Sequence, residues 1–161
     1  METISALKIK PESVIQSGTY MNMDRYQADN AIDNDLNTRS SAVAADGSGG
    51  SWLQINLDKS YCVETVVKYN SAGENEAKWS CSKDHDCLAC QGSNCPYYTL
   101  IVTQNSVEEE NETVKIKKEY CHHQYGDTVI LEAKTSAPLY VNEIAVFGET
   151  GIDHLGKITF N

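Results

Sequence analysis

The sequence predicts an all-β domain, either a sandwich or a barrel. Short runs rich in β-branched and aromatic residues recur between turn-rich segments, while helical signals are scarce. At 161 residues, the chain has the length of one domain that buries roughly two-thirds of its unfolded surface. We therefore expect a single domain over residues 1–161 with one hydrophobic core.

The expected strands follow one another along the chain and are bounded by Gly, Pro, Asn or Asp. Residues 51–57 alternate strictly, with Leu53, Ile55 and Leu57 on one face, as in a strand with one side in the core. A turn at 58–60 should separate this strand from the next. The full set of expected strands is 51–57, 61–69, 97–104, 113–120, 127–133 and 139–148.

Two stretches depart from this rhythm. Residues 70–96 are too long and too polar for a hairpin loop, so we expect a loop insertion that is held by its own cross-links. Residues 105–113 carry four Glu and predict a solvated connection between strands. Near the start, only residues 11–18 and 26–32 could supply a helical turn.

Cysteine usage points to an oxidising compartment. The count is even, and four of the six lie within fifteen residues: Cys62, Cys81, Cys87, Cys90, Cys95 and Cys121. We expect two disulfides inside the insertion, with open connectivity, and a third between Cys62 and Cys121. The alternatives are a zinc site and a redox dithiol. Gaps of five, two and four residues and the absence of a βαβ pattern argue against both.

A formal net charge of −10 opposes binding to nucleic acid or to anionic lipid, because both need clustered Lys and Arg. The chain contains no apolar run of membrane-spanning length, and residues 1–14 lack the apolar core of a signal peptide. The sequon at 111–113 is compatible with secretion. The cysteines favour an extracellular or cell-surface location. A cytosolic or organellar protein with reduced cysteines is the alternative.

Three motifs occur in a recognisable order: Asn-Ala-Ile-Asp at 30–33, Trp-Leu-Gln-Ile-Asn-Leu at 52–57 followed by Val-Glu-Thr-Val at 63–66, and Asn-Glu-Ile-Ala-Val-Phe-Gly at 142–148. With this order the chain resembles the coagulation factor V/VIII C-type family, also called discoidin domains, and the related fucose-binding lectins. The resemblance implies a galactose-binding-like jelly roll, a β-sandwich of two antiparallel sheets, with a core at about 14–148 and a tail at 149–161. Ile32 would anchor a loop to the core, Trp52 would close one end of the sandwich, and ligands would bind to loops at one end.

The stretch at 27–41 concentrates Asp and Asn residues, whose oxygens suit calcium. Fucose-binding relatives hold a structural calcium in an Asn-x-x-Asp-x-Asn turn, with further oxygens from a Ser and from the last core strand. By position, the resemblance implies a calcium site formed by Asn30, Asp33, Asp35, Ser41, Asn142 and Glu143, in which Asn30 and Asn142 act through their carbonyls. The alternative is a turn whose Asx side chains cap their own backbone.

The fucose-binding relatives grip sugar with an Arg-x-Asp motif, which is absent after Asn70, because both arginines, Arg25 and Arg39, precede the Trp strand. What remains is a rim of loops at 19–26, 44–51, the insertion and 121–126. It offers aromatic, amide and imidazole groups of the kinds that hold sugars. The candidate rim residues are Tyr20, Met23, Arg25, Trp79, His85, His122 and His123. Each of them taken alone could equally be an ordinary packing or surface residue.

No nucleophile–base pattern, phosphate loop or metal-hydrolase motif occurs, so we expect no catalysis. We expect a lectin-like recognition module that binds a glycan or a cell-surface glycoprotein and contains calcium. A protein-binding adhesion or assembly domain with no sugar ligand is the alternative, and membership of a larger adhesion protein is compatible with both. Tyr20, Met21, Met23 and Tyr26 could form a membrane spike, but the acidic charge disfavours lipid.

Overall fold

The computed structural model describes residues 7–44, 50–70, 75–92, 95–106 and 108–150. Its strands are β1 (Leu7–Ile9), β2 (Pro11–Gln16), β3 (Ser40–Ala42), β4 (Trp52–Tyr69), β5 (Asn75–Ser82), β6 (Asp86–Gln91), β7 (Tyr98–Thr103), β8 (Gln124–Ala133), β9 (Leu139–Val141) and β10 (Glu143–Glu149). Its helices are α1 (Glu112–Tyr120) and the 3₁₀-helices η1 (Tyr20–Asn22), η2 (Asp24–Tyr26), η3 (Ala28–Ile32) and η4 (Cys95–Tyr97). Residues 151–161 of the expected tail lie outside the described residues.

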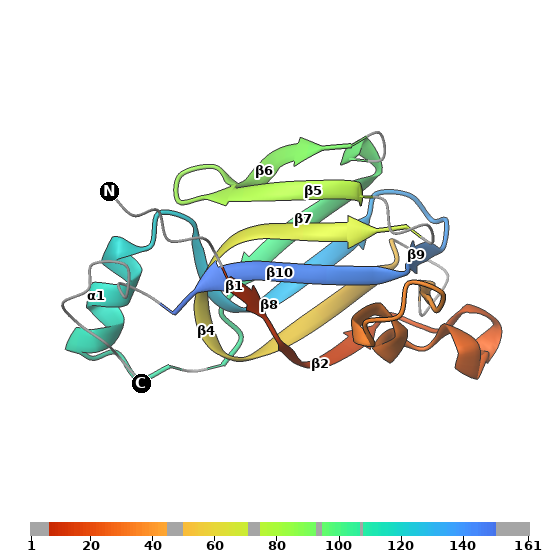
Figure 1. The fold of residues 1–161 in the computed structure, drawn as a ribbon, viewed down its shortest axis with the longest axis horizontal. Coiled ribbons are helices and arrows are strands. Elements are labelled where there is room, and N and C mark those ends of the chain that lie inside the picture. Colours follow the sequence, from red (N-terminus) through yellow and green to blue (C-terminus); the bar gives the residue numbers. More distant parts are fainter. Residues whose placement is uncertain (1–6, 45–49, 71–74, 93–94, 107, 151–161) are drawn as a thin grey trace.

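The long strand β4 belongs to both layers of a β-sandwich (Figure 1). Its first half pairs with β2 and β8, and its second half pairs with β10 and β5. Strand β7 extends the first layer beyond β8, while β1 and β6 extend the second beyond β10 and β5. Strands β3 and β9 form a separate two-stranded sheet. All of these pairings are antiparallel, which confirms the expected all-β jelly-roll sandwich.

The core lies between the two layers and confirms the alternation expected at the start of β4. Leu53, Ile55 and Leu57 are buried there, while the residues between them are partly exposed. Burying an aliphatic side chain of this size contributes roughly 1.5–3 kcal/mol. The expected turn at 58–60 is wrong, because β4 continues through it with an irregular register between Asn56 and Tyr61.

The buried tryptophan of the described sheets is Trp79 of β5, which is 2% exposed. Trp52, implied by the resemblance to close one end of the sandwich, is only partly buried at the start of β4. The implied loop anchor is confirmed, since Ala31 is fully buried and Ile32 packs against the core cluster.

The expected loop insertion at 70–96 is largely strand. Strands β5 and β6 form an antiparallel hairpin, and β5 pairs with the second half of β4. The hairpin therefore widens the second layer (Figure 1). Polar residues such as Lys78 and Ser80 suggested a loop because one face of this hairpin is exposed to solvent. They alternate with buried Ala77 and Trp79, and this alternation is the pattern of a strand with one face in the core.

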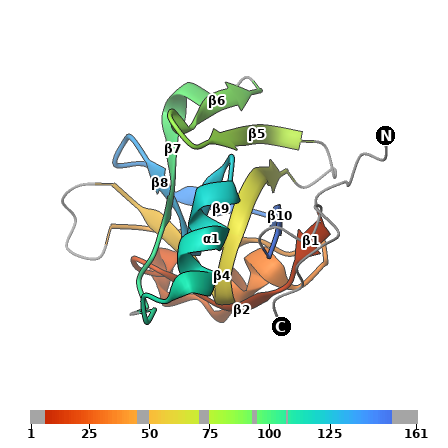
Figure 2. The ribbon, with the colours of Figure 1, turned by 90° about the vertical axis from the view of Figure 1, so that its left-hand side faces the viewer.

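The strand expected at 113–120 is wrong, because α1 occupies this segment. Val114 and Ile116 alternate with polar residues, as in a strand, but the residues at both ends of the segment favour a helix. The Asn111 side chain accepts a hydrogen bond from the Val114 N–H at 3.0 Å and caps the first turn, and two lysines occupy the last turn. Helix α1 lies across one end of the sandwich (Figure 2). Within the described ranges, no helix has the length and apolarity needed to cross a membrane.

The N-terminal segment adds strands where a helical turn was considered. Strand β2 occupies most of 11–18 and pairs with β4, and β1 pairs with β10, so the sheets begin before the expected core start at Val14. The helical turns near 26–32 are confirmed by η2 and η3.

All six cysteines form disulfides, which leaves no thiol for the zinc or dithiol alternatives. Cys62 bonds to Cys121, as expected, although Cys121 follows α1 and does not lie on a strand. Within the former insertion, Cys81 bonds to Cys87 across the β5–β6 turn, and Cys90 bonds to Cys95. The Cys62–Cys121 bond attaches the end of α1 to β4.

Replacing Cys62 and Cys121 with alanine should lower the melting temperature more than replacing Cys90 and Cys95. The first bond joins residues 59 apart in sequence and the second joins residues 5 apart, so loop entropy predicts losses of about 4 and about 2 kcal/mol. Thermal unfolding followed by circular dichroism measures both variants. An equal or smaller loss for the long-range pair would contradict this account.

Candidate functional site

A cluster of tyrosines and arginines lies at the loop end of the sandwich, where η1 and η2 approach β9 (Figure 1). We call it the tyrosine–arginine cluster, and its members are Tyr20, Arg25, Tyr26, Arg39 and Tyr140. They come from η1, η2, the segment before β3, and β9. The cluster therefore joins chain segments that are more than a hundred residues apart.

Guanidinium groups and rings alternate within the cluster. The Arg39 guanidinium carbon lies 5.4 Å from the Tyr26 ring centroid and 4.7 Å from that of Tyr140. Arg25 lies 4.9 Å from the Tyr26 centroid. Tyr20 meets Tyr26 edge-on, with centroids 5.9 Å apart, and lies 6.4 Å from Tyr140. Each cation over a ring contributes about 0.5–1 kcal/mol at such exposed sites.

Hydrogen bonding from Arg39, aided by the charge of Arg25, lowers the pKa of the Tyr26 phenol. The phenol thus lies within the field of both guanidinium groups. The two arginines of the whole chain, whose formal net charge is −10, thus both lie at this end.

Side-chain amides hold the backbone of the cluster in place. The Asn30 amide nitrogen donates to the carbonyl of Arg25 at 2.7 Å and to the carbonyl of Arg39 at 3.1 Å. The Gln16 amide nitrogen donates to the Tyr26 carbonyl at 3.1 Å and to the Thr19 hydroxyl at 2.9 Å. Asn30 therefore connects the two arginine-bearing segments directly.

The loop that carries Tyr20 has an uncommon backbone. Met21 and Asn22 both have φ near 52°, in the left-handed region. Asn tolerates this region, whereas for Met it costs about 1 kcal/mol or more. The Met21 side chain is 71% exposed, so no packing contact in the core explains this conformation. Such strain is concentrated at ligand sites.

The structure brings together only some of the seven residues expected on the rim. Tyr20, Met23 and Arg25 lie together, and an Arg25 N–H approaches the Met23 sulfur at 3.8 Å. The expectation that Trp79 lies on the rim is wrong, because its side chain is buried in the hydrophobic core. Residues 45–49 of the expected rim loop at 44–51 lie outside the described residues.

The three histidines expected on the rim lie at the other end of the sandwich, near α1. His85 lies in the β5–β6 turn. The His122 carbonyl accepts a hydrogen bond from the Lys83 N–H at 3.1 Å, and His123 Nδ1 lies 2.8 Å from the Cys81 carbonyl. His122 and His123 thus attach the hairpin turn to the start of β8, and they share no site with Tyr20.

Sequence reasoning left Arg39 and Tyr140 out of the site and treated Tyr26 only as a possible membrane contact. A signal for Tyr140 existed, because it alternates with buried Leu139 and Val141 and so faces outward. The proximity of β3 to β9 that brings Arg39 beside it follows from tertiary pairing.

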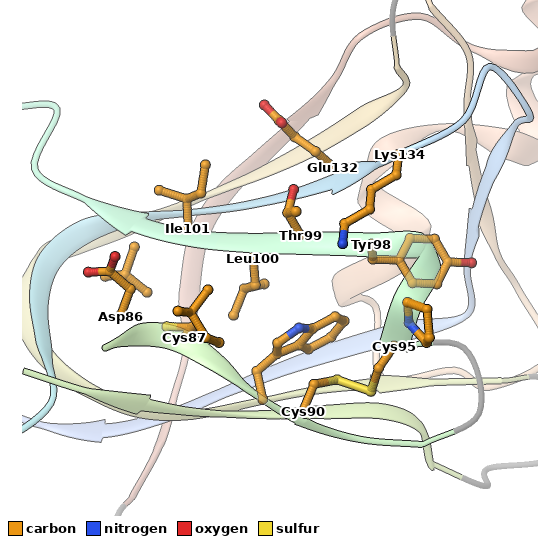
Figure 3. A pocket seen from close by; sticks show the side chains of 14 residues that line it. Asp86, Cys87, Cys90, Cys95, Tyr98, Thr99, Leu100, Ile101, Glu132 and Lys134 are labelled. Carbon is orange, nitrogen blue, oxygen red and sulfur yellow. A yellow bond between two sulfur atoms is a disulfide. The ribbon is translucent and has the colours of Figure 1, made fainter. Parts of the chain in front are cut away.

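A groove of about 740 Å³ lies between β6 and β7, away from the tyrosine–arginine cluster (Figure 3). Its apolar walls include Leu88, Leu100 and Ile101, next to the Cys90–Cys95 disulfide. Glu132 and Lys134 lie on its polar side. The aromatic side chain of Trp79 contributes to the groove but is too buried to stack on a sugar ring. The tyrosine–arginine cluster is therefore the better candidate for a polar ligand.

The turn at 33–38 is stabilised by its own side chains. Asp33 accepts hydrogen bonds from the Asp35 N–H at 2.9 Å and from the Thr38 hydroxyl at 2.5 Å. Asp35 accepts from the Asn37 N–H at 2.9 Å. The Asn142 amide nitrogen donates to the carbonyls of Leu36 and Thr38, each at 3.1 Å. These are the contacts expected from the Asx-turn alternative.

The carboxylate of Glu143 lies against this turn in a buried position. Its oxygens accept the Asn34 N–H at 3.1 and 3.3 Å, and the residue is 6% exposed. Burial, with the charges of Asp33 and Asp35, raises the pKa of Glu143 to about 7, although the Asn34 N–H and Lys8 oppose the shift.

Calcium at this turn stays a prediction from the resemblance. Among the described residues, no three Asp, Glu, His or Cys side chains converge as metal ligands. Calcium here would depend on backbone carbonyls and hydroxyls together with Glu143, a set that it accepts. The Ser41 hydroxyl is buried without a hydrogen-bond partner, as an unused oxygen ligand would be.

No protein-family model matches this chain, and no curated protein matches it. Solved structures do match. A family 32 carbohydrate-binding module from C. perfringens NanJ, in complex with galactose, is 16% identical, with 89% of this chain and 99% of that chain covered and a TM-score of 0.54. A Streptococcus pneumoniae fucose-binding module, SpX-3, is 15% identical, with 91% and 100% covered and a TM-score of 0.53. These structures are consistent with a discoidin-like fold.

A third solved structure is the family 32 module of AlyQ in complex with 4,5-unsaturated mannuronic acid. It is 13% identical, with 88% of this chain and 98% of that chain covered and a TM-score of 0.50. At such identities the likeness shows the β-sandwich fold, and the chain spans nearly the whole length of each of the three modules.

Replacing Glu143 with glutamine should stabilise the protein at about pH 8 in the presence of a chelator and have little effect at about pH 4. Since the folded pKa of about 7 exceeds the ordinary value of 4.5, the folded state binds more protons between these values and loses stability as pH rises through them. We expect a gain of about 1–2 kcal/mol at the higher pH, allowing for partial screening by solvent. Urea unfolding at both pH values measures it, and destabilisation at pH 8 would contradict the account.

Proposed function

We propose that this domain is a non-catalytic extracellular recognition module that binds carbohydrate through the tyrosine–arginine cluster. The observation that carries the proposal is the convergence of Tyr20, Tyr26 and Tyr140 with Arg25 and Arg39 at one loop end. Rings and hydrogen-bond donors held side by side are what a sugar needs, because it presents an apolar face and a rim of hydroxyls.

The fold likeness supports the same class of ligand. Modules of this fold were solved with galactose and with an unsaturated mannuronic acid, and another is described as fucose-binding. Some solved structures of this fold are parts of larger enzymes, including an alginate lyase, so a binding module attached to other domains is a natural setting. The proposed partner is a glycan or a cell-surface glycoprotein.

The disulfides support an extracellular or cell-surface location. All six cysteines are paired, and such bonds form and persist in oxidising compartments.

Calcium is the proposed structural ion of the turn at 33–38. Glu143 would supply a carboxylate, Asp33 and Asp35 would add charge, and the carbonyls of Asn30 and Asn142 and the Ser41 oxygen would complete the set. The buried position of the Glu143 carboxylate against this turn supports the assignment, because a bound cation would stabilise its ionised form.

Replacing Tyr140 with alanine should weaken glycan binding about tenfold, because it removes an exposed ring that also supports Arg39. The matched control is Tyr120→Ala, which removes a ring of similar exposure, 42% against 38%, from α1 at the other end. Affinity is measured by calorimetry with a glycan selected on an array. Equal affinities of the two variants would place the site elsewhere.

The same array separates the sugar-binding proposal from the protein-binding alternative. A folded sample that binds no glycan would favour a protein-binding adhesion or assembly domain.

Calcium should raise the melting temperature of the wild-type protein, since a ligand that binds only the folded state stabilises it. In Glu143→Gln the calcium-dependent rise should shrink to less than half, because the ionised carboxylate is missing. Thermal melts with calcium and with excess chelator measure this at neutral pH. If the melting temperature of the wild-type protein were the same under both conditions, the turn would be an ordinary Asx turn without a bound calcium ion.

A further inference from the structure

The arginines of the cluster lie over tyrosine rings and carry more N–H groups than the cluster engages. Each guanidinium has five N–H groups, and the contacts of these groups within the cluster are those of both arginines with the Tyr26 phenol and of Arg25 with the Met23 sulfur. Arg39 has tyrosine rings 5.4 and 4.7 Å away, and Arg25 lies over Tyr26 at 4.9 Å. The N–H groups of a guanidinium point outward in its plane. Both side chains are exposed. The planar N–H edge is the part that binds carboxylate and related oxyanions.

Among the described residues, no carboxylate forms an ion pair with either arginine. Two ion pairs of these residues, Lys118 with Glu110 and His123 with Glu64, involve other segments of the chain. Asp24, adjacent to Arg25 in sequence, accepts a hydrogen bond from the Gln27 amide at 3.2 Å. On a chain with a net charge of −10, two arginines held together without an acidic partner leave room for an anion from outside.

The two cationic segments are fixed relative to each other before any ligand binds. The Asn30 amide nitrogen holds the carbonyls of both Arg25 and Arg39. Preorganisation of this kind lowers the ordering cost of binding. The arrangement also bears on the type of sugar, because guanidinium groups cover the Tyr26 ring that a neutral sugar would use for stacking.

We propose that the glycan bound at the tyrosine–arginine cluster is acidic, and that Arg25 and Arg39 bind the carboxylate or sulfate oxygens of one sugar residue. This inference rests on the proposed carbohydrate-binding function and deepens it. The tyrosines then serve chiefly to orient the guanidinium groups, and Asn30 is a positioning residue. Because the charges are exposed, affinity falls several-fold between about 0.05 and 0.5 M NaCl.

The test uses an array with matched glycans: sialylated and desialylated, uronate and uronate methyl ester, sulfated and unsulfated. We expect binding to the acidic member of at least one pair and loss of about tenfold or more in affinity for its neutral counterpart. Binding to the sialylated or uronate glycans would show that a carboxylate is recognised, whereas binding to the sulfated glycan would show that a sulfate is recognised.

Variants locate the effect. Arg25→Ala should weaken binding of the acidic glycan about tenfold, whereas Lys115→Ala, the same loss of charge on exposed α1, should leave it within about twofold. Arg39→Lys keeps the charge but loses the planar fork and should also weaken binding. Thermal melts confirm that each variant is folded.

The other outcomes would contradict either the acidic-ligand inference alone or carbohydrate binding as well. Preference for neutral glycans, or Arg25→Ala behaving like Lys115→Ala, would overturn the acidic-ligand inference and leave carbohydrate binding intact. A folded wild-type protein that binds no glycan of either kind would overturn both.

Discussion

Strand β4 pairs with four other strands, β2 and β8 along its first half and β10 and β5 along its second, and it therefore fixes the two layers of the sandwich relative to each other. Its buried face carries Leu53, Ile55, Val63 and Val66 into one core. The Cys62–Cys121 bond is formed just beyond the register irregularity, so that α1 is tied to the same strand. A loss of β4 packing would release both layers at once.

The loop end derives its shape from this frame. The ribbon of β3 and β9 brings the segment before Ser40 beside Tyr140, and the buried Ala31 keeps η3 against the core. From η3, Asn30 reaches the backbone of both arginines. On the other side of the same segment, the turn at 33–38 meets Glu143, so a cation there and a ligand at the tyrosine–arginine cluster would be held by adjacent parts of one loop. Rigid support on one side and exposed donors on the other is the arrangement expected of a binding site.

The sequence predicted the sandwich because strict alternation, as in Leu53, Ile55 and Leu57, reports which side of a strand is buried. It failed where local and tertiary effects compete. The segment at 113–120 alternates like a strand, yet the Asn111 side chain caps a helix there. The polar hairpin at 75–91 resembled a loop because it lies at a solvated edge. Of the site, Tyr20 and Arg25 could be found from the sequence, whereas Arg39 and Tyr140 meet them only through the β3–β9 pairing, which no local pattern encodes.

The most direct test of the central claim is a crystal structure of the domain with the glycan that binds it most tightly. We expect the sugar at the tyrosine–arginine cluster, with its acidic group at the N–H edges of Arg25 and Arg39 and Tyr140 beside the ring. Density for the sugar in the groove between β6 and β7, or beside His122 at the α1 end, with the cluster left in contact with water alone, would contradict it.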